Sequence, residues 1–384
     1  MTVTANRPSP PVVPPAPPAK IRKRRSPLWA RLSVTAGVVL MIAGGGGLIG
    51  GKMLISQTTE TIEVQDLTGD AKKTVEEGGG ATIEGPIDLL LMGVDKRASW
   101  SDDTLHADTI IILHIPATHD QAFLISVPRD TEVETPAFAK SKWEGGTVKA
   151  TEAFYWGAQN GAGAAGGAQL LAKTLKNMTG ISFDGAAIIN FNGFKGVIDE
   201  LGGVDMCVDQ QVTSKHLGLI DGKPVYLTDA AREGLNPKPV VHKVGCRKMA
   251  GWEALDYARQ RYGLKNGDYD RQRHQQQLLK AMAKKASDSG VMTNPLKISS
   301  LIKSAGSAFT LDIGDIELPD FALGMKNVAA NDMVLLRTNS GTFSSNGNGR
   351  EQFQDISLQM FQAAKKDQLG EFVLDHPEVV ANEK

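Results

Sequence analysis

The stretch Ile87–Asp95 reads IDLLLMGVD: a short apolar run, Ile87–Met92, that is soon followed by a carboxylate. Two further short runs rich in Ile, Leu and Val follow at Thr109–Ile115 and Ala122–Val127. Such runs are typical of strands that are buried on both faces. They predict the central strands of a β-sheet that helices cover on both sides.

Helical patterns alternate with further strands along the rest of the chain. A helix is predicted over Ala164–Met178, where Gly180 stops it. The other predicted helices are Phe194–Leu201, Lys248–Ala258, Asp268–Lys285, Asn294–Ala305, Leu318–Asn327 and Gln352–Ala364, and the other predicted strands are Ala186–Phe191, Val204–Val208 and Met333–Leu336. Strands that alternate with helices indicate an α/β fold, with a mixed central sheet flanked by helices.

Near the N-terminus a basic segment stands directly before an apolar one. No Asp or Glu precedes Glu60, whereas residues 20–31 are rich in Lys and Arg. Residues 32–51 carry no charge, and a helix of that length spans about 30 Å, the thickness of a bilayer core. Because positive charge stays cytoplasmic beside a membrane span, we predict one transmembrane helix with the N-terminus in the cytoplasm and the folded domain outside it.

A cleaved signal peptide is the alternative interpretation of this segment. We favour an uncleaved anchor, because the apolar run is long and no obvious A-x-A cleavage site follows it. The predicted organisation begins with a disordered Pro-rich and basic cytoplasmic tail (1–31), a transmembrane helix (32–51) and an extracytoplasmic linker (52–85). The core of the folded domain (86–290), a C-terminal part of the same domain (291–367) and a loose tail (368–384) follow.

Charge and cysteine content exclude two classes of protein. The formal net charge of −1 gives no global attraction to nucleic acid, and the basic run is interpreted as a topology signal. The two cysteines, Cys207 and Cys246, have no suitably spaced His beside them, which argues against structural zinc. Since disulfides persist outside the cytoplasm, we favour a Cys207–Cys246 bond over two buried thiols.

Charged residues stand where the predicted strands begin or end. Asp95 follows the first strand, Asp108 immediately precedes the second, and Arg129 follows the third. Binding sites in α/β sheets collect at strand ends. Each residue taken alone is more often a solvated loop charge, so only their combination indicates a site.

A second group of polar residues lies later in the chain. Arg259 and Arg261 are two apart, so their side chains point to one side if the segment is extended. On the predicted helix that follows, Asp268, Arg271 and Gln275 are three and four apart and share one face. The alternative is a solvated polar helix with internal ion pairs.

This set of residues fits the handling of phosphate. The sequence has no G-x-S-x-G elbow, P-loop or H-E-x-x-H motif. Guanidinium groups pair with phosphate oxygens, and carboxylates hold Mg²⁺, which bridges phosphates. Because phosphoryl transfer relies on positioning and charge neutralisation, the residues predict a pyrophosphate substrate and Mg²⁺ or another divalent cation.

Seven segments, in consistent order, resemble the LytR–CpsA–Psr family of cell-wall polymer ligases. They are Asp88–Asp95, Asp108–His114, Ile125–Asp130, Phe191–Phe194, Val197–Val204, Ala254–Arg261 and Asp268–Gln276. The resemblance implies an extracytoplasmic α/β domain that binds a polyprenyl phosphate tail in an apolar tunnel and the head group in an Arg-lined cleft with Mg²⁺.

The resemblance also implies roles for individual residues. Carried over by motif, the metal-side carboxylates are Asp95 and Asp108. The pyrophosphate clamp consists of Arg129, Arg259, Arg261 and Arg271. The residues that orient the clamp or the attacking hydroxyl are Asp268 and Gln275. The chain departs from the family pattern at His106 and His274, where the family commonly has Arg. A His at these positions can contact phosphate when protonated, but a lone His is more often structural.

The reaction implied by the resemblance moves a glycopolymer from a polyprenyl pyrophosphate carrier to a hydroxyl of peptidoglycan or another wall glycan. Polyprenyl phosphate is released. Two alternatives stay open: a hydrolase of polyprenyl pyrophosphates, and a non-catalytic lipid-binding or regulatory wall protein. The sequence does not separate the hydrolase from the transferase, because an acceptor groove has no signature.

Overall fold

The computed structural model describes residues 63–73, 85–95, 104–291, 309–313 and 333–381, with isolated positions between 294 and 306. All of the described residues belong to one compact unit, Gly51–Lys384. The predicted Pro-rich tail and the transmembrane helix at 32–51 lie outside the described residues, as does the helix predicted over Leu318–Asn327. Within the described part of the chain, no helix combines the length and apolarity needed to cross a membrane.

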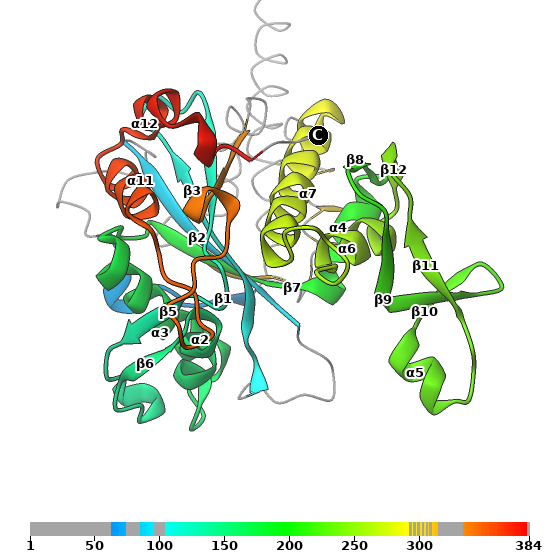
Figure 1. Cartoon of the computed structure of the whole chain (residues 1–384), viewed down its shortest axis with the longest axis horizontal. Coiled ribbons are helices and arrows are strands. Elements are labelled where there is room, and N and C mark those ends of the chain that lie inside the picture. The colour runs from blue at the N-terminus through cyan, green and yellow to red at the C-terminus, as the bar shows by residue number, and fades with distance from the viewer. Residues whose placement is uncertain are drawn as a thin grey trace, which may run out of the picture. The chain divides into compact units, whose positions relative to one another are not determined.

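A seven-stranded mixed sheet forms the centre of this unit (Figure 1). In spatial order its strands are β1 (Glu63–Val64), β13 (Phe309–Asp312), β7 (Gly185–Asn190), β2 (Ile87–Val94), β3 (Ala107–Ile115), β4 (Ala122–Ser126) and β14 (Met333–Arg337). The β1–β13, β2–β7 and β4–β14 pairs are parallel, and the other pairs are antiparallel. The predicted mixed sheet with buried central strands is therefore confirmed.

Helices cover both faces of the sheet. The helices are α2 (Ala150–Ala158), α3 (Gly163–Thr179), α4 (Phe191–Glu200), α5 (Leu227–Arg232), α6 (Gly251–Arg259), α7 (Asp268–Asp288), α11 (Asp355–Lys365) and α12 (Leu369–Asp375). Alternate β2 side chains point to opposite faces: Leu90 and Met92 join the core formed with α2, α3 and α11. Leu89 and Leu91 belong to the other face, where Leu279 of α7 packs.

Residues 204–249 form a separate β-structure that we call the arm. Its base is the antiparallel pair β8 (Val204–Val208) and β12 (Gly245–Met249), and its outer part is the three-stranded sheet β10 (Lys223–Tyr226), β9 (Val212–Ile220) and β11 (Lys238–His242). Figure 1 shows that the outer strands and α5 extend away from the central sheet beyond α4 and α6. A second small hairpin joins β5 (Glu132–Thr135) to β6 (Gly146–Lys149).

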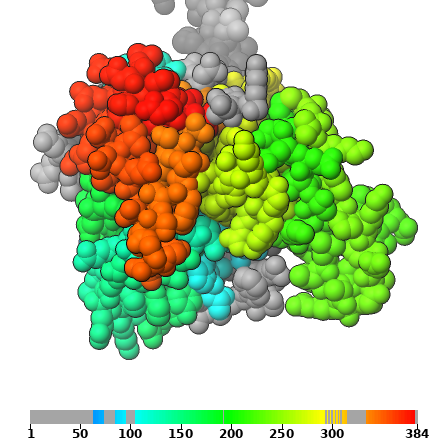
Figure 2. All heavy atoms as spheres, in the orientation of Figure 1, coloured from blue at the N-terminus to red at the C-terminus, as the bar shows by residue number. Residues whose placement is uncertain are grey.

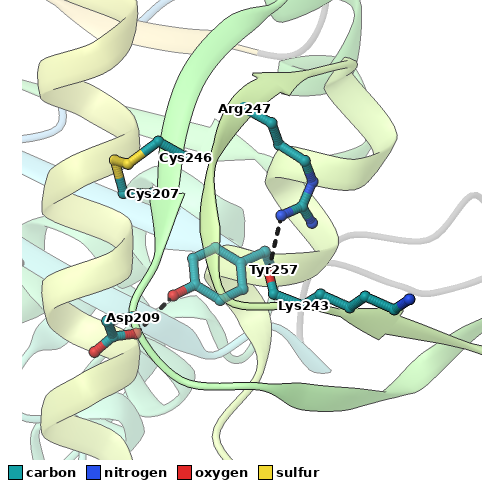
Figure 3. The surroundings of a disulfide bond; sticks show 6 residues. All are labelled: Cys207, Asp209, Lys243, Cys246, Arg247 and Tyr257. Atoms are coloured by element: carbon teal, nitrogen blue, oxygen red, sulfur yellow. Dashed lines mark hydrogen bonds between the residues drawn. A yellow bond between two sulfur atoms is a disulfide. The ribbon is translucent and has the colours of Figure 1, made fainter.

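A disulfide fixes the base of the arm. Cys207 and Cys246 are direct partners in the β8–β12 ladder and are bonded to each other (Figure 3). They lie on the exposed face of β8, while Val204, Met206 and Val208 alternate with them into the core beside α4 and α6. The predicted disulfide is confirmed.

Two boundary predictions were wrong at the ends of the domain. Part of the predicted linker belongs to the fold, because Leu67, Thr68 and Ala71 are fully buried. The Asp312 carboxylate accepts hydrogen bonds at 3.0 Å from the Leu67 and Thr68 amides. At the other end the predicted loose tail instead forms α12, which buries Leu369.

The predicted helix over Lys248–Ala258 also starts too early. Residues up to Met249 pair with β8, and α6 begins at Gly251. The Asp199 carboxylate accepts a hydrogen bond from the Gly251 amide at 2.7 Å, which satisfies one of the free donors at the helix start. Strands β9, β10 and β11 were not predicted, because their sequences carry many polar residues and lack an apolar run.

We expect removal of the disulfide to destabilise the arm base. A crosslink between residues 39 apart in sequence contributes on the order of 4 kcal/mol in the chain-entropy model. The double variant Cys207→Ser/Cys246→Ser should therefore lower the midpoint of thermal unfolding by several degrees, and reductant should do the same to the wild type only. Equal midpoints for variant and wild type under oxidising conditions would contradict this.

Candidate functional site

A polar cleft of about 740 Å³, open solvent at its mouth included, lies between the ends of β2 and β3, the loop after β4, and helices α6 and α7. Its lining residues are Asp95, Asp108, Arg129, Phe191, His216, Arg259, Arg261, Tyr262, Arg271 and Gln275. The structure thus brings together seven of the eight predicted site residues, which come from five separate segments of the chain.

Carboxylates pair with the arginines on the cleft walls. Arg259 donates to the Asp95 carboxylate at 2.8 Å, and Arg129 forms an ion pair with Asp108. Four guanidinium groups face two carboxylates here, so positive charge exceeds negative by two among the lining residues. The cleft is therefore built to receive an anion.

Arg271 is the most deeply buried of the four arginines, with 7% of its side chain exposed. It forms an ion pair with Asp268 at 2.8 Å and donates to the backbone carbonyl of Asp108 at 2.8 Å. Asp268, the eighth predicted residue, does not line the cleft but fixes Arg271 from one helical turn away. The predicted shared face of α7 is confirmed for these two residues.

The backbone after α6 is extended, which is the conformation in which Arg259 and Arg261 were expected to point to one side. Gln260 has φ −68° and ψ 135°, so Arg259 and Arg261 both line the cleft while Gln260 points the opposite way. Gln260 is buried and donates to Asp256 and Ser214. Arg261 donates to the Tyr262 hydroxyl at 2.7 Å, and this hydrogen bond raises the pKa of Arg261.

An apolar cavity of about 450 Å³, its mouth included, continues from the cleft between the sheet and helices α4, α6 and α7. Its lining residues are Leu91, Gly93, Thr109, Ile111, Ile189, Phe191, Phe194, Leu255, Ala258, Arg259, Gln275, Leu278 and Leu279. Three of these, Phe191, Arg259 and Gln275, also line the cleft. The guanidinium of Arg259 lies 5.1 Å from the centre of the Phe191 ring.

Gln275 stands at the junction of the cleft and the cavity. Its side-chain oxygen and nitrogen are both buried, and neither has a hydrogen-bond partner within the part of the chain that the structure describes. Buried polar atoms are normally paired, because leaving them unpaired costs free energy. This geometry favours a role for Gln275 in contacting a ligand that occupies the junction.

The residues present fit a magnesium ion that is shared with a phosphate ligand. Mg²⁺ prefers oxygen donors and usually takes one or two carboxylates together with substrate phosphates and water. Asp95 and Asp108 supply two such carboxylates to one cleft. Among the described residues, no group of three or more His, Cys, Asp or Glu is arranged to hold a metal, so a closed structural site is not formed there.

The two histidines that replace family arginines do not line the cleft. His274 is fully buried, stacks on Tyr257 with ring centroids 4.3 Å apart and shares Asp209 with it. Burial lowers the pKa of His274, although the Asp209 carboxylate opposes this. Because the ring is fully buried and does not line the cleft, its role is structural. Figure 3 shows the Tyr257–Asp209 bond close to the disulfide. His106 stacks on Tyr155.

Sequence reasoning missed His216, Tyr262 and Phe191 as lining residues. Phe191 lies in a segment that carries the family resemblance, and Tyr262 directly follows Arg261, so the sequence offered a reason to consider both as site residues. His216 comes from β9 of the arm, where no sequence motif points to the site. Burial, together with the charge of Arg259, lowers the pKa of His216 and keeps its ring neutral.

Glu351 does not line the cleft but connects two segments that do. It is 2% exposed and accepts hydrogen bonds from the Tyr269 hydroxyl and, at 3.1 Å, from Asn339. Its backbone amide donates to the Asp130 carbonyl at 3.1 Å. Glu351 therefore ties the start of α7 to the loop that carries Arg129. Burial raises the pKa of Glu351 to about 7.

Fold and site together define an α/β domain in which an arginine-rich anion cleft continues into an apolar cavity. The LytR_cpsA_psr family matches the chain over residues 52–368. The chain belongs to the LytR–CpsA–Psr family, and the predicted resemblance is confirmed.

Named relatives have modest identity to this chain. The cell wall biosynthesis protein LcpA of Corynebacterium glutamicum is 26% identical over 360 residues, covering 87% of this chain and 64% of LcpA. The polyisoprenyl-teichoic acid–peptidoglycan teichoic acid transferase TagV of Bacillus subtilis is 27% identical over 220 residues, covering 57% of this chain and 48% of TagV. The chain thus matches about half to two thirds of the length of these relatives.

Solved structures share the fold. The protein gbs0355 of Streptococcus agalactiae superposes with a TM-score of 0.56 at 20% identity, covering 74% of this chain and 88% of that one. The crystal structure of Bacillus subtilis TagV gives a TM-score of 0.52 at 20% identity, covering 75% of this chain and 99% of that one. The likeness agrees with the mixed α/β architecture.

The raised pKa of Glu351 predicts a pH-dependent stability. Its ordinary pKa is 4.5 and its folded value is about 7, so its contribution is complete below pH 4.5 and is lost as pH rises through 7. Glu351→Gln keeps an acceptor for Tyr269 and should remove this slope, which amounts to on the order of 3 kcal/mol. Denaturant unfolding from pH 4.5 to 8 checks this, and parallel pH profiles would contradict it.

Proposed function

We propose that the protein is a membrane-anchored extracytoplasmic phosphotransferase that moves a glycopolymer from a polyprenyl pyrophosphate carrier to a hydroxyl of peptidoglycan or another wall glycan. The observation that carries the proposal is the continuity of the arginine cleft with the apolar cavity through Phe191, Arg259 and Gln275. A ligand that suits both parts has a multiply charged head and a long apolar chain, and a polyprenyl pyrophosphate has both.

The apolar chain would lie between the sheet and helices α4, α6 and α7. The cavity walls there are almost wholly aliphatic or aromatic, including Ile111, Phe194 and Leu278. Burial of apolar surface stabilises such a complex by about 25 cal/mol per Å² removed from water. Arg259, at the cavity mouth, would meet the first phosphate of the head group.

The reaction follows from the charges that surround this head group. The acceptor hydroxyl oxygen attacks the phosphorus that carries the glycan, the bond from that phosphorus to the bridging oxygen breaks, polyprenyl phosphate leaves, and the hydroxyl proton passes to solvent or a nearby base. Arg129, Arg259 and Arg271 would neutralise the negative charge that gathers on the oxygens as the bond breaks. No covalent intermediate with the protein is needed.

Paired carboxylates keep this clamp in position. Asp268 and the backbone of Asp108 hold Arg271, so little reorganisation is needed when the substrate binds. Asp95 and Asp108 would hold Mg²⁺, which when bound supplies further charge neutralisation to the pyrophosphate oxygens. Gln275, with no hydrogen-bond partner among the described residues, would orient the head group or the attacking hydroxyl.

The relatives support the cell wall as the setting. LcpA is named for cell wall biosynthesis and TagV for transfer of teichoic acid to peptidoglycan. The basic and apolar run at residues 20–51 supports a single membrane anchor with the domain outside the cytoplasm. The disulfide is consistent with an oxidising compartment.

Arg129→Ala should lower kcat/KM for glycopolymer transfer by on the order of 100-fold or more, because the substitution removes one guanidinium group that stabilises the transition state. Arg129→Lys should recover only part of this, because an ammonium is a point charge. Release of polyprenyl phosphate and attachment of glycan to wall fragments are both measured.

The matched control is Arg232→Ala, which removes an exposed arginine of α5 on the arm and should leave both rates unchanged. Release without attachment in the wild type would make the protein a polyprenyl pyrophosphate hydrolase. Lipid binding without release, under every acceptor tried, would make it a non-catalytic lipid-binding protein.

Removal of divalent cations with a chelator should stop turnover, and Mg²⁺ should restore it. Asp95→Asn weakens the oxygen donor set, so the Mg²⁺ concentration that gives half-maximal rate should rise about tenfold or more. Asp229→Asn, on the exposed α5, serves as control. A wild-type rate that is unaffected by the chelator would overturn the assignment of the metal.

A further inference from the structure

A second hollow opens on the arm side of helix α6. It encloses about 550 Å³, its mouth included, and its lining residues are Lys195, His216, Leu217, Pro224, Tyr226, Trp252, Leu255, Asp256 and Arg259. These residues come from α4, α6 and strands β9 and β10. Figure 2 shows the outer part of the arm set apart from α7 on the viewed face. We call this space the arm hollow.

The arm hollow connects with the cleft. His216 and Arg259 line both spaces. Leu255 of α6 lines the arm hollow and also the apolar cavity, so helix α6 separates these two spaces. A group bound in the arm hollow would therefore reach the arginine cleft beside Arg259 without crossing the apolar cavity.

The lining of the arm hollow differs in chemistry from that of the apolar cavity. Trp252 and Tyr226 offer aromatic surface, and Lys195 and His216 offer polar groups beside it. An aromatic ring beside polar groups suits a sugar ring, whose C–H faces pack on the aromatic surface while its hydroxyls form hydrogen bonds. A polyprenyl chain, which has no polar groups, matches the apolar cavity better.

The hollow is built on a rigid frame. A Cβ placed on Gly251 would lie 2.4 Å from the Lys195 carbonyl oxygen, so glycine is needed where α6 contacts α4. Trp252 follows directly in the same helix. One turn further along α6, the buried Asp256 is hydrogen-bonded to His242 at 2.7 Å and accepts from Ser214 at 2.9 Å, which joins α6 to the arm.

His216 marks the end of the hollow where an acceptor would meet the cleft. Its backbone amide donates to the Ser214 hydroxyl at 3.0 Å. A neutral imidazole has one ring nitrogen that can accept a hydrogen bond. Guanidinium groups have no acceptor, so His216 is well suited to accept a hydrogen bond from a hydroxyl that enters the cleft.

We propose that the arm hollow is the acceptor subsite: it binds a pyranose ring of the wall glycan against Trp252 and Tyr226, with the reacting hydroxyl directed past His216 into the cleft. This proposal rests on the transfer reaction proposed above. It assigns strands β9 and β10 of the arm, which line the hollow and contribute no residue to the apolar cavity, to recognition of the acceptor. The sugar of the donor is the rival occupant of the same space.

The test measures steady-state transfer by the full-length chain in detergent, with a peptidoglycan tetrasaccharide as acceptor and a polyprenyl pyrophosphate-linked glycan as donor. Trp252→Ala should raise KM for the tetrasaccharide about fivefold to tenfold, the loss of one aromatic contact, and leave KM for the donor unchanged. Trp252→Phe should restore most of the affinity. The matched control is Phe343→Ala, which removes an exposed aromatic side chain that does not line the arm hollow and should leave both KM values unchanged.

Binding of the tetrasaccharide is followed separately by calorimetry, without donor. Binding that weakens in Trp252→Ala supports the arm hollow even if the wild type transfers nothing, whereas transfer with an unchanged acceptor KM in Trp252→Ala overturns it and leaves the transfer reaction intact. A rise in donor KM alone would assign the hollow to the sugar of the donor. Neither binding nor transfer by the wild type would overturn both proposals.

Discussion

The mutual repulsion of four arginines in one cleft is the constraint on which the rest of the structure depends. Guanidinium groups so close together are held only where carboxylates offset them and hydrogen bonds satisfy their donors. Asp95, which directly follows β2, Asp108 of β3 and Asp268 of α7 supply that charge. The end of β2, the beginning of β3 and the start of α7 therefore meet at one place. The surplus of positive charge that remains is available to an anionic ligand.

Helix α7 joins the chemistry of the cleft to the packing of the core. Its first turn places Arg271 in the cleft with Asp268 paired to it, and Leu278 and Leu279, two turns later, line the apolar cavity. Gln276 points the other way and donates to the carbonyls of Leu124 and Leu336 at 2.9 and 2.8 Å, which ties α7 to β4 and β14. One helix thus positions a charged group and an apolar wall on either side of Gln275. This arrangement explains why a single amphiphilic ligand can suit both spaces.

The sequence predicted the central strands and the residues of the cleft, because both are local patterns. Continuous apolar runs identify strands that are buried on both faces, and charged residues that directly flank such runs fall at the edge of the sheet. The outer part of the arm was not predicted, because its exposed strands, such as β10 with the sequence KPVY, carry no apolar period and are held by pairing with their neighbours. Glu351 and His216 were missed for a related reason: each acts through residues far away in sequence, and a single residue in a polar segment carries no signal of such a contact.

The central claim is that the cleft and the cavity bind one lipid pyrophosphate, head and tail. The most direct test is a crystal structure of the protein with geranylgeranyl pyrophosphate and Mg²⁺. The account predicts the diphosphate against Arg129, Arg259 and Arg271, and the prenyl chain between the sheet and helices α6 and α7. A prenyl chain bound in the arm hollow, or a diphosphate held away from these arginines, would contradict it.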